Sequence, residues 1–240
     1  MDLVKMNQLK EDALQFGVEL NEKQLSQFLR YYEMLIDWNE KINLTAITEF
    51  EEVLKKHFLD SISIGRFFKL NGKVSILDIG TGAGFPGIPI KIAFPDTKIT
   101  LLDSLNKRVI FLNEVIKELS LENITALHGR AEDFAKKEDM REQFDFCVSR
   151  AVANLSSLSE FCLPYVKVGG TFISYKSEKA KEELVASENA ISILGGGNVE
   201  TDEFLLPGTD FKRTFVIIEK TKVTPKKYPR KAGTPVKQPL

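Results

Sequence analysis

The sequence Ile76-Leu77-Asp78-Ile79-Gly80-Thr81-Gly82-Ala83-Gly84-Phe85-Pro86-Gly87 joins an apolar run to three alternating glycines. A strand covered on both faces has a continuous apolar run, so the first part predicts a buried strand. Glycine has no Cβ and tolerates positive φ, so the backbone after that strand can approach a ligand closely. Pro86 suits the first turn of a helix. The stretch therefore predicts a strand, a nucleotide-binding turn and a helix.

Outward from this turn, strand and helix patterns alternate with short links, which is typical of a doubly wound α/β sheet. The expected strands are 74–79, 98–103, 123–128, 144–149 and 170–176. The expected helices are 86–94, 105–119, 131–138, 153–166 and 178–193. Two further strand-like runs, 198–206 and 211–220, are separated by Pro207-Gly208. They predict a hairpin, and with it a mostly parallel sheet whose last strand is antiparallel.

The first seventy residues have helical periodicity and no strand pattern. Asn21 with Gln24, and Thr48 with Glu51, each predict a capping box at a helix start. A shorter helix is expected around Leu9 to Phe16. The expected organisation is an N-terminal helical cap at 1–70, an α/β domain at 71–224 and a C-terminal tail at 225–240.

Charge is distributed unevenly along the chain. The formal net charge is −1, but the residues from Lys220 onward include seven basic side chains and no acidic one, which leaves −8 on the rest. A positive tail favours a polyanion or an acidic partner, although such ends are also often simply solvated. With four prolines in the last sixteen residues, the tail is expected to be extended.

Several classes of protein are disfavoured by composition. No run of eighteen apolar residues and no basic-then-apolar leader is present, so we expect a cytoplasmic protein without a membrane span. The cysteines, Cys147 and Cys162, lack zinc-site spacing, and the histidines are only His57 and His128, so no metal site is expected. Cys147 lies in an apolar strand pattern and is expected to be an inert buried thiol.

Residues outside the glycines narrow the choice of ligand for the glycine turn. Asp103 ends the next expected strand, where a carboxylate can accept hydrogen bonds from both hydroxyls of a ribose. The glycines alone also fit a dinucleotide pattern, or a tight turn with no ligand. Asp78-x-Gly80-x-Gly82-x-Gly84 and the terminal hairpin together resemble class I S-adenosylmethionine-dependent methyltransferases. The expected fold is therefore the Rossmann-like sheet of that class, with S-adenosylmethionine as cofactor.

A closer resemblance rests on motifs spread over nearly the whole chain. They are Asn43-Leu44-Thr45, His57-Phe58-Leu59-Asp60-Ser61, the glycine turn extended by Phe85-Pro86-Gly87, Ser149-Arg150-Ala151, and the tail Tyr228-Pro229-Arg230-Lys231-Ala232-Gly233-Thr234-Pro235. Together they resemble the RsmG family, also called glucose-inhibited division protein B. The resemblance implies a monomeric methyltransferase that acts on N7 of a guanine in 16S rRNA, either as RNA or in the small ribosomal subunit. A small-molecule methyltransferase, a nicotinamide-dependent oxidoreductase and a noncatalytic rRNA-binding assembly factor are the alternatives.

Carried over by position, the resemblance implies a set of site residues. S-adenosylmethionine is expected to contact Gly80, Phe85, Asp103, Ser104, Leu105, Ala131, Glu132 and Arg150. Arg150 is also the catalytic candidate, as a clamp on cofactor or guanine, against the alternative of a surface loop arginine. Lys176 ends the next expected strand, at the same edge of the sheet as Arg150, and is a candidate contact for an RNA phosphate. His57 is expected to be a structural histidine, able to pair with Asp60 one turn away.

Overall fold

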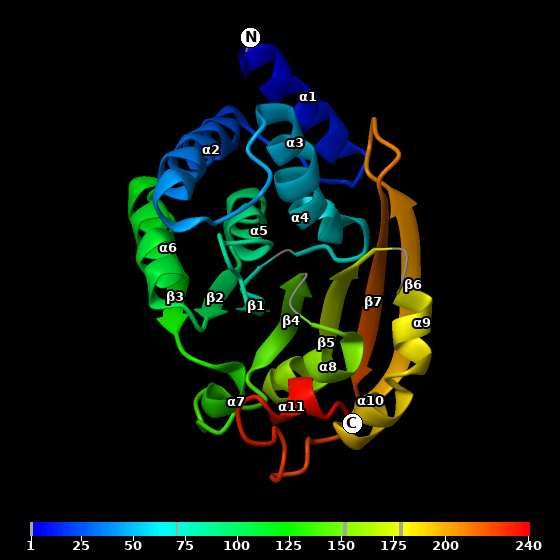
Figure 1. Ribbon diagram of the computed structural model, residues 1–240. Coiled ribbons are helices and arrows are strands. Elements are labelled where there is room, and N and C mark those ends of the chain that lie inside the picture. The colour runs from blue at the N-terminus through cyan, green and yellow to red at the C-terminus, as the bar shows by residue number, and fades with distance from the viewer. Residues whose placement is uncertain (1, 71, 151–152, 178–179) are drawn as a thin grey trace.

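The computed structural model describes residues 2–70, 72–150, 153–177 and 180–240, which form one seven-stranded sheet with helices on both faces (Figure 1). The strands are β1 Ser75–Ile79, β2 Lys98–Asp103, β3 Ile124–His128, β4 Phe144–Arg150, β5 Val166–Lys176, β6 Gly196–Leu205 and β7 Lys212–Lys220. Their order is β3-β2-β1-β4-β5-β7-β6. The first five strands pair in parallel, and β7 is antiparallel to both β5 and β6. The expected α/β sheet with an antiparallel last strand is confirmed.

One face of the sheet is covered by the first half of the helices. These are α1 Asp2–Leu14, α2 Glu22–Ile42, α3 Phe50–Val53, the π-helix Leu54–Leu59, α4 Asp60–Ile62, the 3₁₀ turn Ser63–Arg66, α5 Gly87–Ala93 and α6 Asn106–Glu118. Because successive strand residues point to opposite faces, Ile76 and Val148 pack into this layer. The expected helical cap therefore shares one continuous core with the sheet.

The other face carries the later helices. These are α7 Ala131–Phe134, α8 Leu155–Cys162, the 3₁₀ turn Leu163–Tyr165, α9 Ala180–Val185, α10 Glu188–Ile193 and α11 Thr234–Lys237. Leu77 and Cys147 point into this second core. The helix expected over 131–138 ends at Phe134, and the one expected over 178–193 consists of two helices, with residues 178 and 179 outside the described part of the chain.

Only one of the two expected capping boxes forms. The Asn21 side chain accepts from the Gln24 amide at 3.0 Å, and the Gln24 side chain accepts from the Asn21 amide at 2.8 Å. The box at Thr48 and Glu51 is wrong. Glu49 occupies the N-cap of α3 without a side-chain cap, so the helix starts one residue later than that box requires.

The tail is not extended, which corrects another expectation. It folds back along the second face of the sheet and ends beside α8 (Figure 1). Gly233 adopts φ +82°, and α11 follows with Pro235 in its first turn, where the missing amide hydrogen leaves no helix hydrogen bond unmade. Lys220 is fully buried and donates to the Leu163 carbonyl at 2.6 Å, so it adds nothing to an exposed basic surface.

Candidate active site

The glycine turn leaves β1 at the carboxyl edge of the sheet, where open α/β folds bind ligands. Gly80, Gly82 and Gly84 have φ of +68°, +62° and +100°, which side chains with a Cβ rarely adopt. The Gly80 amide donates to the Leu102 carbonyl at 2.9 Å, and the Gly82 amide donates to the Asp103 carboxylate at 2.9 Å. The turn is therefore fastened to the end of β2.

The glycines of the turn have different tasks. A Cβ on Gly84 would lie 2.6 Å from the Tyr31 hydroxyl, and one on Gly87 would lie 2.3 Å from a methyl group of Leu101. At Gly82 the nearest atom would be the Gly80 carbonyl oxygen at 3.9 Å. Gly84 and Gly87 are thus required for packing, whereas a Cβ on Gly82 would enter open space.

Asp78 supports the turn from inside the protein. Its Oδ2 accepts from the Thr81 hydroxyl at 2.6 Å and from the Gly87 amide at 2.8 Å, while its buried Oδ1 has no partner. Burial raises the pKa of Asp78 to about 7. In the sequence Asp78 belongs to the motif that resembles S-adenosylmethionine-dependent methyltransferases, and in the structure it fixes the start of α5.

Asp103, Ser104 and Leu105 lie together at the end of β2. Besides Gly82, the Asp103 carboxylate accepts from the Leu105 amide at 2.9 Å and lies 3.4 Å from an Arg108 guanidinium nitrogen. A carboxylate has about four lone-pair sites, so acceptor capacity remains for a ribose hydroxyl. Ser104 and Leu105 are exposed. The structure brings Gly80 and Asp103 to one edge, as the spacing predicted.

Ala131 and Glu132 follow the neighbouring strand, because β3 pairs with β2 in a register that puts His128 beside Asp103. Glu132 is buried, and its Oε1 accepts from the Gly233 amide of the tail at 2.8 Å. The Ala131 carbonyl accepts from the Tyr165 hydroxyl at 2.6 Å. The tail contact was not anticipated from the sequence.

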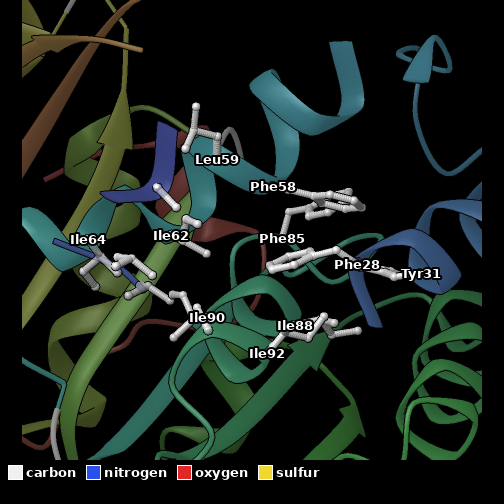
Figure 2. Close-up of a cluster of buried hydrophobic side chains, with 14 of the residues drawn as sticks. Phe28, Tyr31, Phe58, Leu59, Ile62, Ile64, Phe85, Ile88, Ile90 and Ile92 are labelled. Carbon is white, nitrogen blue, oxygen red and sulfur yellow. The ribbon is translucent and has the colours of Figure 1, made fainter. Parts of the chain in front are cut away.

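Phe85 lies in an aromatic cluster between the glycine turn and the cap (Figure 2). Its ring is 6% exposed, stacks on His57 with centroids 4.5 Å apart and lies 5.6 Å from Tyr31. Phe28 and Phe58 complete the cluster from α2 and the π-helix. The ring therefore packs the turn against the cap, a role that the sequence interpretation did not give it.

Arg150, at the end of β4, is bound to the cap. One guanidinium nitrogen donates to Asp60 Oδ2 at 2.9 Å and to the Lys56 carbonyl at 3.1 Å, and the guanidinium carbon lies 4.9 Å from the centre of the Phe85 ring. Arg213 of β7 donates to the other oxygen of Asp60 at 2.8 Å. Asp60 is buried, so two guanidinium groups share one buried carboxylate and leave a net positive charge.

His57 joins the same network as a neutral side chain. Its Nδ1 lies 3.3 Å from an Arg150 nitrogen, and its Nε2 lies 2.8 Å from the Thr45 hydroxyl. Burial, and then the Arg150 charge, lower the pKa of His57 to about 3. Both ring nitrogens are bonded, as expected of a structural histidine, and both His57 and Asp60 bind Arg150. Four of the five motifs therefore meet here, at Thr45, His57 with Asp60, Phe85 and Arg150. The tail motif lies elsewhere, beside α8, and Ala151 lies outside the described residues.

A pocket of about 620 Å³ opens over this network at the ends of β4 and β5. Its lining includes Ile47, His57, Asp60, Arg150, Lys176 and Arg213. Lys176 donates to Glu183 at 2.7 Å and to the Ala153 carbonyl at 2.9 Å, so it is engaged within the chain. Arg213 was missed from the sequence; the available signal was the basic pair Lys212-Arg213 at the start of a strand whose centre, 215–218, is apolar.

Metal binding, thiol chemistry and membrane insertion find little support among the described residues. Among the described residues no group of three or more His, Cys, Asp or Glu side chains could hold a metal ion. Cys147 and Cys162 are buried free thiols, and burial raises the pKa of the Cys147 thiol, as expected for an inert cysteine. Of the described helices, none combines the length and apolar character that a bilayer span requires.

Comparison with known sequences identifies close relatives. The family model described as rRNA small subunit methyltransferase G (GidB) matches residues 24–209. A ribosomal RNA small subunit methyltransferase G from Lachnoclostridium phytofermentans is 58% identical over 224 residues, covering 93% of each chain. One from Alkaliphilus metalliredigens is 53% identical over 232 residues, covering 97% of each chain. The family model spans most of the cap and of the sheet, and the second relative aligns with 97% of this chain.

Solved structures support the fold alone, because their sequences are distant. An S-adenosylmethionine-dependent methyltransferase from Aquifex aeolicus matches with a TM-score of 0.51 at 18% identity, covering 70% of this chain and 92% of that one. Methanococcus jannaschii TYW2, solved in complex with S-adenosylmethionine, matches with a TM-score of 0.52 at 14% identity, covering 72% and 77%. The architecture is that of class I methyltransferases.

Proposed function

The chain belongs to the rRNA small subunit methyltransferase G family, and on that premise we propose that it transfers a methyl group from S-adenosylmethionine to N7 of a guanine in 16S rRNA. The observation that carries the proposal is the meeting of two sites at one sheet edge. The open glycine turn with Asp103 lies at the ends of β1 and β2, and the cationic pocket around Arg150 lies at the ends of β4 and β5.

The residues at the first of these sites suit the cofactor. Gly82 leaves the space that a Cβ would fill, and Asp103 keeps acceptor capacity for ribose hydroxyls. The amide side of the turn and the segment Asp103 to Leu105 would hold the nucleoside, with Ala131 and Glu132 beside the adenine. When bound, S-adenosylmethionine supplies a methyl group activated on a sulfonium sulfur.

The residues at the second site suit an RNA acceptor. Guanine N7 has a lone pair and no proton, so methyl transfer to it requires alignment rather than a general base. Arg150 can present its guanidinium to the guanine O6 edge, and Arg213 can bind a phosphate. Lys176, by contrast, is held by Glu183 and the Ala153 carbonyl. Asp60 and Glu183 offset these charges, which limits repulsion of the positive charge that passes to the guanine ring.

The test is methylation of defined RNA acceptors. The protein is incubated with labelled S-adenosylmethionine and either naked 16S rRNA or small ribosomal subunits, and the modified nucleotide is mapped by mass spectrometry. We expect one modified guanine, methylated at N7. Normal cofactor binding without transfer to either acceptor would contradict the proposed substrate.

A further inference from the structure

The C-terminal tail is bound to the body by polar contacts along its length. Arg141 donates to the Thr224 carbonyl at 2.8 Å and to the Tyr228 carbonyl at 2.9 Å. Farther along, the Ser157 hydroxyl donates to the Pro235 carbonyl at 2.8 Å, and the Ser156 hydroxyl donates to the Leu240 carbonyl at 3.1 Å. The tail thus runs along α8 toward the edge of the sheet that carries the candidate site.

The strongest of these contacts is an ion pair between the middle of the tail and a buried carboxylate of α8. The Arg230 guanidinium binds both oxygens of Glu160, at 2.6 Å to Oε2 and 3.0 Å to Oε1, and the Arg230 amide donates to Oε1 at 2.7 Å. The Glu160 side chain is 1% exposed. A bidentate, charge-assisted contact of this kind fixes both position and orientation.

Three residues after this pair, the tail reaches the expected adenine loop. The Gly233 amide donates to Glu132, whose carboxylate is buried, so this contact holds one rotamer of Glu132. The loop has little support of its own, because α7 spans only Ala131–Phe134 and a single helical turn is unstable in isolation. The tail therefore adds a second anchor to the one that the Tyr165 hydroxyl makes with the Ala131 carbonyl.

We propose that the docked tail, residues 228–240, is a positioning element for the cofactor site, and that the Arg230–Glu160 pair sets the affinity for S-adenosylmethionine through the Gly233–Glu132 contact. This inference rests on the proposed function, because it takes Ala131 and Glu132 as cofactor contacts. By thermodynamic reciprocity, a bound cofactor that requires the ordered loop also stabilises the docked tail.

The first experiment removes the pair without leaving a buried charge. In the double variant Arg230→Met with Glu160→Met, both partners become apolar and of similar length. Calorimetry is expected to give a dissociation constant for S-adenosylmethionine at least fivefold higher than that of the unmodified chain. At saturating cofactor, kcat on rRNA is expected to stay within twofold of that of the unmodified chain. The substitutions are therefore expected to raise KM for S-adenosylmethionine. Lys237→Met, at another exposed residue of the same tail, is the matched control and is expected to change neither.

The second experiment uses the unmodified chain, so it does not depend on a variant that folds. Backbone hydrogen exchange of residues 228–235 is expected to slow when S-adenosylmethionine is added to saturation. If the exchange rates of these tail amides do not change when S-adenosylmethionine binds, the inference is overturned. So would an unchanged dissociation constant in a double variant whose tail exchanges faster. Absence of S-adenosylmethionine binding by the unmodified chain would instead contradict the proposed function.

Discussion

A substitution at Gly82 is expected to reduce cofactor affinity more than it reduces the stability of the fold. In Gly82→Ala the methyl group enters the open space beside the turn, so affinity for S-adenosylmethionine is expected to fall at least tenfold. The positive φ costs about 1–2 kcal/mol of stability. Calorimetry and urea unfolding measure the two effects. Unchanged cofactor affinity would show that the turn serves only the fold.

Gly87→Ala is the matched comparison for that variant. Its Cβ would lie 2.3 Å from Leu101 and 2.8 Å from the Asp78 carboxylate, so core atoms must move. Overpacking of this kind costs roughly 1–3 kcal/mol, and the main effect is expected on unfolding. A variant as stable as the unmodified chain would contradict this packing role.

His57 is expected to make the fold sensitive to acid. Its pKa is about 3 in the folded protein and 6.5 ordinarily, so between these values the unfolded chain binds a proton that the folded chain does not. Its contribution to stability is therefore complete above pH 6.5 and falls as pH decreases toward 3, by at most about 1.4 kcal/mol per pH unit. Urea unfolding from pH 7 to 4.5 should show a shallower decline in His57→Gln. His128→Gln, at the exposed second histidine, is the control.

Residue patterns predicted the site unevenly. Gly82 and Asp103 could be singled out because Gly82 follows one strand and Asp103 ends the next, and strand ends are readable from local pattern. Arg213 and the Glu132–Gly233 contact depend on chain segments that meet only in three dimensions. No local spacing encodes that Arg150 and Arg213 share one carboxylate.

Helix α2 supports the glycine turn directly, and this can be tested at one atom. The buried Tyr31 hydroxyl donates to the Ala83 carbonyl within the turn. Tyr31→Phe leaves that carbonyl without its partner and is expected to lower the free energy of unfolding by about 1–3 kcal/mol and to weaken cofactor binding. Tyr32→Phe, one residue along, removes a hydroxyl that bonds Thr48 in an exposed setting, and a much smaller loss is expected. Equal losses in the two variants would contradict the supporting role of α2.

Elements were predictable where their pattern was strong. The strands of the parallel sheet lie within one or two residues of their expected bounds, except that β5 begins earlier, at Val166. The capping box at Asn21 formed because both partners occupy their positions, whereas Glu49 displaced the one at Thr48. The tail was misjudged because four prolines suggested an extended chain, while a buried Glu160, invisible to local pattern, holds it in place.

At the scale of the whole molecule, the charge imbalance found in the sequence needs correction. Lys220 is buried and Arg230 is paired with Glu160, so neither adds to the exposed charge of the tail. Lys226, Lys227 and Lys231 are exposed. The tail thus has two chemically separable parts: contacts that dock it, and lysines that remain available to RNA.

Changing these three lysines tests the second part alone. In Lys226→Gln, Lys227→Gln and Lys231→Gln combined, Arg230 and Gly233 keep their contacts, so affinity for S-adenosylmethionine is expected to stay unchanged. Each phosphate contact to single-stranded RNA adds about 0.7 to the slope of log affinity against log salt, so the slope is expected to become shallower by about 2. Filter binding to rRNA at several salt concentrations measures it. The same change at Lys69, Lys73 and Lys98, exposed near the opposite edge of the sheet, controls for net charge. If both triple variants flatten the slope equally, the effect is one of overall charge, and the tail lysines do not contact the RNA.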